Sequence, residues 1–133
     1  MGKYFSIEEL YQSNTANAKG IDNTPNALQK TNLENLIKNI LDPLREAYGK
    51  PISVNSGFRC EALNKAVGGA KNSEHLSGCA ADIDVHSVAG NKELFELIQK
   101  LNLPFRQLID EKNMSWVHVS YNPSDIKRQV LKL

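Results

Sequence analysis

Apolar residues recur at helical spacing in the first half of the chain and mainly alternate as in strands in the second half, and this difference limits the folds that the chain can adopt. An apolar stripe at helical spacing runs from Leu33 to Leu44. The second half contains short alternating runs at 80–85, 107–109 and 116–121, interrupted by one further helical pattern. Early helices followed mainly by strands favour an α+β fold, in which a small antiparallel sheet is flanked by helices.

Local signals predict where several of these elements begin and end. Thr24 and Pro25 predict a helix start, because a hydroxyl cap followed by proline in the first turn is a common opening. Pro43 lies inside the helical pattern that follows and predicts a kink or a break. The polar segment 13–23 is expected to be a loop, and residues 111–115 are expected to form the turn of a hairpin.

Size, charge and cysteine content narrow the class of protein. With 133 residues, of which 41% are hydrophobic and 23% charged, the chain is expected to form a single domain over residues 1–133 and to be a monomer. A net charge of +1 without a basic stripe argues against nucleic acid as a partner. No apolar run is long enough for membrane insertion, and the N-terminal segment lacks the apolar stretch of a signal peptide. Cys60 and Cys79 are too few for a disulfide scaffold and are expected to be reduced thiols.

Three residues are potential metal ligands. Two of them lie in strand-like regions, and the third lies in the loop before one of these regions. His75 and Asp82 lie seven positions apart in the segment 73–82, and His118 lies in the run 116–120. Two imidazoles and one carboxylate, with water in the fourth position, are typical of a catalytic rather than a structural Zn²⁺ site. Such a set holds the metal but leaves it acidic enough to form hydroxide from water near neutral pH.

A hydrolytic metal site also needs a base for the water and a positive group near the developing oxyanion. Glu111 and Arg59 are the candidates for these two tasks. Asp84 is a further acid near the site, which could accept a hydrogen bond from a ligand imidazole or cap the end of a loop. His86 has no motif around it and is expected to be a surface residue.

Several short motifs occur in an order that is typical of one known family. They are Ser56-Gly57-Phe58-Arg59, Leu63-Asn64, Gly68-Gly69, the pattern Ser-x-His-x-x-Gly-x-Ala-x-Asp at 73–82, and Trp-Val-His-Val-Ser at 116–120. Together they resemble the zinc D-alanyl-D-alanine carboxypeptidase family. That family includes L-alanyl-D-glutamate endopeptidases of phage endolysins and D-alanyl-D-alanine dipeptidases, and it shares its fold with the hedgehog signalling domain. The resemblance implies this hedgehog-like α+β fold.

Position by position, the resemblance implies that His75, Asp82 and His118 bind Zn²⁺. It implies that Arg59 meets a substrate carboxylate or the polarised carbonyl, and that Ser73 lines the site beside His75. These roles extend the ligand set to a complete peptidase site.

The sequence departs from the family at the base. Many relatives carry Asp or Glu three residues before the last histidine, where this chain has Ser115, which cannot act as a base. A subgroup resembles Gln107-Leu108-Ile109-x-Glu111 instead, so Glu111 is the implied base, and its neighbour Asp110 would point to the opposite face. Trp116 is a candidate to stack on substrate, although an aromatic side chain in a strand commonly packs in the core.

The implied activity is zinc-dependent hydrolysis of peptide bonds in peptidoglycan stem peptides, of the D-Ala-D-Ala carboxypeptidase or the L-Ala-D-Glu endopeptidase type. A phage or prophage lysis enzyme, made in the cytoplasm and reaching the cell wall by a holin-type route, would suit the missing signal peptide. The alternative is a non-catalytic module that keeps zinc for stability and binds cell-wall or phage-structural partners. The orientation of Glu111 relative to the metal is expected to distinguish the two.

Overall fold

Five strands form one sheet in the order β1-β2-β4-β3-β5 in the computed structural model, which describes residues 3–133. The strands are β1 (Ser53–Ser56), β2 (Ala80–Asp84), β3 (Gln107–Glu111), β4 (Trp116–Ser120) and β5 (Gln129–Lys132). β1, β2, β4 and β3 pair in antiparallel fashion, and β5 pairs with β3 in parallel. The expected α+β fold and the hairpin that joins β3 to β4 are therefore confirmed, but the sheet is mixed rather than wholly antiparallel, because β5 pairs with β3 in parallel.

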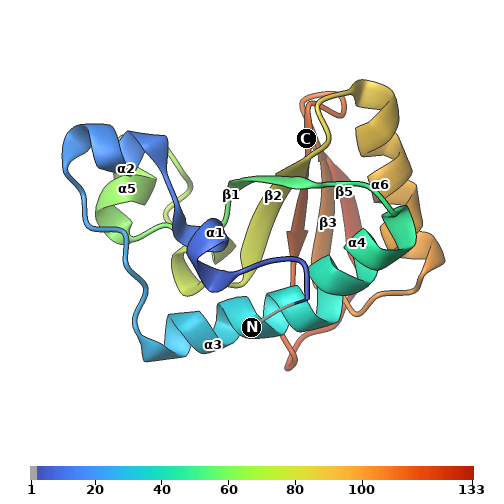
Figure 1. The fold of residues 1–133 in the computed structure, drawn as a ribbon, viewed down its shortest axis with the longest axis horizontal. Coiled ribbons are helices and arrows are strands. Elements are labelled where there is room, and N and C mark those ends of the chain that lie inside the picture. Colours follow the sequence, from blue (N-terminus) through green and yellow to red (C-terminus); the bar gives the residue numbers. More distant parts are fainter. Residues whose placement is uncertain (1–2) are drawn as a thin grey trace.

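Helices precede, separate and flank these strands (Figure 1). They are α1 (Ile7–Tyr11), α2 (Asn14–Lys19), α3 (Ala27–Leu36), the π-helical turn η1 (Ile37–Leu41), α4 (Asp42–Tyr48), α5 (Glu61–Ala66), the 3₁₀ turn η2 (Glu74–Ser77) and α6 (Val88–Lys100). In Figure 1, α6 lies on one side of the sheet, while α2 and α5 lie beyond β1 on the opposite side of the molecule. No helix within residues 3–133 is long and apolar enough to cross a membrane.

The two faces of the sheet have different chemistry, as the period of two along each strand requires. One set of alternating side chains, including Ala81, Ile83, Val117 and Leu108, is buried in the apolar core together with the helical stripe. The other face carries several polar side chains, among them those of Asp82, Glu111 and His118. Because Asp82 pairs with His118, these two side chains project from neighbouring strands on the same face.

The N-terminal region differs from the sequence prediction in two places. The segment 13–23, predicted as a loop, contains α2, because the Ser13 hydroxyl accepts a hydrogen bond from the amide of Ala16 (3.1 Å) and caps a short polar helix. Helix α3 begins two residues later than Thr24 and Pro25 predicted. Its cap is Asn26, which exchanges reciprocal bonds of 2.8 Å with Gln29 in a capping box.

Two further features were incompletely predicted. Pro43 does not break the helical region: the chain passes through the wider turn η1 directly before it and continues as α4. Strand β5 was not predicted at all, since its residues 129–132 are mostly exposed and show no buried alternation. Residues 1 and 2, at the start of the segment examined for a signal peptide, lie outside the described part of the chain.

Candidate metal centre

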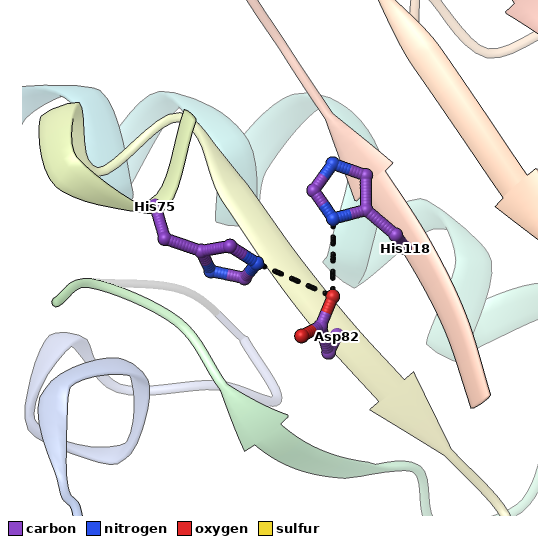
Figure 2. Close-up of side chains that lie close together, drawn as sticks. All are labelled: His75, Asp82 and His118. Atoms are coloured by element: carbon purple, nitrogen blue, oxygen red, sulfur yellow. Dashed lines mark hydrogen bonds and ion pairs between the residues drawn. The ribbon is translucent and has the colours of Figure 1, made fainter. Parts of the chain in front are cut away.

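The three predicted ligands lie together on the polar face of the sheet (Figure 2). His75 comes from η2, Asp82 from β2 and His118 from β4. The Asp82 Oδ1 atom lies 3.3 Å from Nε2 of His75 and 3.1 Å from Nδ1 of His118. One potential ligand atom from each residue lies within 4.8 Å of the other two, so one cation can be reached by all three.

Each imidazole has a partner on one ring nitrogen, and its other ring nitrogen is left free to bind a metal. The Nδ1–H of His75 donates to the carbonyl of Gly57 at 2.6 Å, which leaves the lone pair of Nε2 facing Asp82. The Nε2 atom of His118 lies 3.4 Å from Oε1 of Glu74, which leaves Nδ1 facing Asp82. The ligand set is thus oriented by the surrounding chain, as metal-binding imidazoles commonly are.

The support of His75 depends on a close backbone approach. Gly57 follows β1, and a Cβ atom at this position would collide with the backbone carbonyl of Leu10 in α1. The next residue, Phe58, donates its amide to the same carbonyl at 2.7 Å. Only glycine therefore fits between α1 and η2 at the point where the carbonyl of residue 57 receives the His75 proton.

Without a cation, the carboxylates of this cluster are paired with protonated nitrogen atoms of the imidazoles. Burial alone would lower the pKa of His118, but hydrogen bonds with the Asp82 and Glu74 carboxylates raise it to about 9. Burial alone would raise the pKa of Asp82, but the hydrogen bonds and charges of His118 and His75 hold it well below its usual range. A buried site that holds an extra proton beside an ionised carboxylate is suited to exchange that proton for a divalent cation.

These shifts predict how the stability of the metal-free protein depends on pH. The pKa of His118 is about 9 in the folded protein and about 6.5 in an unfolded chain. Its charged form therefore stabilises the fold fully below about pH 6.5, and this contribution is lost as the pH rises towards 9. Urea unfolding with a chelator present should show a falling free energy of unfolding over this range. A His118→Gln variant should lack this component, and an equal decline in that variant would contradict the assignment.

Arg59 and Ser73 both contact His75. The Arg59 amide donates to the carbonyl of His75 (3.0 Å), and its Nη2 lies 3.4 Å from the Ser73 hydroxyl. That hydroxyl also caps η2 by accepting from the amide of His75 at 3.1 Å. Within residues 3–133, the buried Nε of Arg59 has no hydrogen-bond partner. Burial lowers the pKa of Arg59, and the nearby charge of Asp82 acts in the opposite direction.

Arg59 also faces a cavity of about 460 Å³ at the outer edge of the sheet. The cavity is lined by residues of β1, by the start of α2 and by Leu63 and Val67 around α5. β1 is an edge strand of the sheet, and its Ser56, which lines the cavity, pairs with Asp82, although none of the three ligands lines the cavity itself. Its volume is in the range of pockets that hold ligands of several hundred daltons.

Glu111 lies on the same face of the sheet as the ligands. In the register of β3 and β4, Ile109 pairs with His118 and Glu111 pairs with Trp116. Glu111 therefore projects from the same face as His118, at the next position of β3 after Ile109 that points to that face. Burial raises the pKa of Glu111, and the charge of Asp82 acts in the same direction, while His118 opposes it. A raised pKa suits a carboxylate that must take up and then release a proton.

The neighbouring candidates have structural tasks. Asp110 points to the opposite face, as predicted, where it is buried and accepts from the amide of Met114 at 2.7 Å. The Ser115 hydroxyl donates to the carbonyl of Lys112 at 2.7 Å and stabilises the hairpin turn.

Asp84 accepts from the amide of His86 (2.8 Å) and from Asn91, so it caps the loop after β2. Trp116 is half-buried and pairs with Glu111 in the sheet. Its contact with substrate stays a prediction.

Two residues of the site were missed. Glu74 contacts His118, and Arg106 contacts Glu74 with 3.1 Å between Nη1 and Oε2. Burial would raise the pKa of Glu74, but hydrogen bonds from His118 and Ser120 and the charge of Arg106 lower it. Glu74 occupies a position that the motif at 73–82 leaves unspecified, and only its place next to His75 could have drawn attention to it. Nothing in the sequence signals Arg106.

A His-Asp-His set with two buried imidazoles, on the same face of a small sheet as the acid Glu111, is typical of a metal-dependent hydrolase. A model of the family described as peptidase M15 matches residues 3–120, and the chain belongs to this family. The chain is also similar to the zinc D-Ala-D-Ala carboxypeptidase of Streptomyces albus G, with 52% identity over 48 residues. This match covers 35% of the chain and 19% of that carboxypeptidase, so the chain spans only about a fifth of its relative's length.

Proposed function

We propose that the protein is a zinc-dependent peptidase that hydrolyses peptide bonds in peptidoglycan stem peptides. The observation that carries the proposal is the convergence of His75, Asp82 and His118 on one point, with Glu111 on the same face of the sheet. Membership of the peptidase M15 family supports the reaction, and the similarity to a zinc D-Ala-D-Ala carboxypeptidase supports both the metal and the class of substrate. Two nitrogens and one carboxylate also suit Zn²⁺ by their donor chemistry.

Each residue then has a defined task. His75, Asp82 and His118 would hold Zn²⁺, which supplies a Lewis acid and lowers the pKa of a bound water. Glu111 would take the proton of that water and pass it to the leaving amine. Arg59 would donate to the oxyanion or to a substrate carboxylate, because its buried Nε needs an oxygen partner. Ser73 would hold Arg59 and η2 in place.

The cavity beside Arg59 supports a peptide as the substrate. It lies between the unpaired edge of β1 and the start of α2, and it is large enough for more than one residue of a stem peptide. Such a peptide could be cut at its end or internally. The same proposal includes a phage or prophage lysis role, a holin-type route to the cell wall and action as a monomer.

The test is digestion of purified muropeptides, followed by mass spectrometry, alongside measurement of bound zinc. The expected result is one zinc per chain and one defined fragment, whose mass identifies a terminal D-alanine or an internal cut. Removal of zinc with a chelator should stop release, and added Zn²⁺ should restore it. If zinc is bound but no muropeptide is cut, the chain is instead a zinc-stabilised binding module, and the enzymatic proposal fails.

A further inference from the structure

Glu74 joins the candidate metal centre to a distant part of the chain. It follows Ser73 and precedes His75 in η2, yet its carboxylate faces His118 of β4, with 3.4 Å between Oε1 and Nε2. The side chain of Glu74 is 19% exposed and that of His118 is 10% exposed. At this distance, a partly buried carboxylate interacts with an imidazole far more strongly than an exposed carboxylate does, because water screens the interaction less.

The other oxygen of Glu74 is held from the opposite direction. Oε2 lies 3.1 Å from Nη1 of Arg106, and Nε of Arg106 lies 2.8 Å from Oδ2 of Asp125. The backbone of Arg106 is fixed as well, because its amide donates to the carbonyl of Ser120 at the end of β4 (2.8 Å). A continuous chain of ion pairs thus runs from the loop after β4 through Arg106 and Glu74 to His118.

This arrangement limits the orientation and the tautomer of His118. A carboxylate accepts hydrogen bonds, so the contact with Glu74 requires a proton on Nε2. Nδ1 is then the nitrogen left for a metal, and it is the one that faces Asp82 at 3.1 Å. With Arg106 holding Glu74, the ring is fixed before any metal arrives.

We propose that Glu74 is a positioning residue that holds His118 in the tautomer and orientation needed to bind the metal through Nδ1. The inference rests on the proposed zinc ligation by His118. Glu74 itself does not touch the metal or the substrate. It acts through His118, and outer partners of this kind affect metal affinity by about 10–100-fold in zinc enzymes.

The test measures zinc affinity by competition with a chelator for wild type, Glu74→Ala and Glu74→Gln. Glu74→Ala is expected to bind zinc about 10–100-fold more weakly. Glu74→Gln should lose less, because its amide oxygen still accepts from Nε2–H. The matched control is Glu93→Ala, an exposed glutamate of α6, which should bind as wild type does.

A second readout separates positioning from general stability. Replacing zinc by Co²⁺ gives visible absorption bands that report the geometry of the ligands. We expect altered bands for Glu74→Ala and unaltered bands for Glu93→Ala. Wild-type affinity and bands in Glu74→Ala would overturn the inference while leaving the ligand assignment intact. Failure of wild type to bind zinc would overturn both the ligand assignment and this inference. If Glu74→Ala does not fold, Glu74→Gln decides: a small but measurable loss of zinc affinity with altered bands supports the inference, and affinity and bands equal to wild type overturn it.

Discussion

Glu111→Gln is expected to release muropeptide fragments about 10²–10⁴-fold more slowly than wild type while keeping its full zinc content. The substitution preserves the shape of the side chain on the polar face of β3 but removes its ability to take a proton. Zinc should stay bound because Glu111 lies outside the set formed by His75, Asp82 and His118. The measurement is the initial rate of fragment release by mass spectrometry, together with metal analysis of the same sample.

The control for this prediction is Glu93→Gln, which makes the same chemical change at an exposed position of α6. It should cut at the wild-type rate. If Glu111→Gln also cuts at that rate, Glu111 is not the base, and a water molecule or another acid must take the proton. If Glu111→Gln loses zinc, Glu111 helps to hold the metal, and its proposed role as a base outside the ligand set is wrong.

The sequence predicted the fold well where apolar side chains that enter the core recur at a regular period. The stripe from Leu33 to Leu44 and the runs in β2 and β4 were found because one side of each is fully buried. Strand β5 was missed for the opposite reason: it lies at the edge of the sheet, is mostly exposed and depends on a parallel pairing with β3. Helix α2 was missed because its stability comes from the Ser13 cap and one buried alanine, which hydrophobic periodicity does not detect.

The candidate site shows a similar division between local and long-range information. His75, Asp82 and His118 could be predicted because their spacing and neighbours carry a recognisable pattern, and the structure places them together. Glu74 was overlooked although it lies inside that pattern, since its importance comes from contacts with His118 and Arg106, which are 44 and 32 positions away. Contacts at such separation depend on the register of β2 and β4, and a single sequence does not reveal that register.

Asp82→Asn is expected to remove zinc from the protein, with a larger loss of affinity than the roughly 10–100-fold caused by outer partners. Asp82 is the one anionic member of the set, and its Oδ1 atom contacts both imidazoles. An asparagine keeps the volume but offers a neutral carbonyl oxygen, so two imidazoles alone must hold the cation. Metal analysis after gel filtration should find little zinc, and muropeptide cleavage should be lost with it.

The same substitution has a second effect that can be measured without any metal. Hydrogen bonding and charge from Asp82 help to raise the pKa of His118 to about 9, so removing that carboxylate should lower the pKa towards its ordinary range. Glu74 remains in Asp82→Asn and keeps part of the shift. NMR titration of the His118 ring in the zinc-free wild-type and variant proteins measures this change. A variant that loses zinc but leaves the pKa of His118 unchanged would show that Asp82 binds the metal without pairing with His118. A variant that keeps zinc would show that the ligand set itself is wrong.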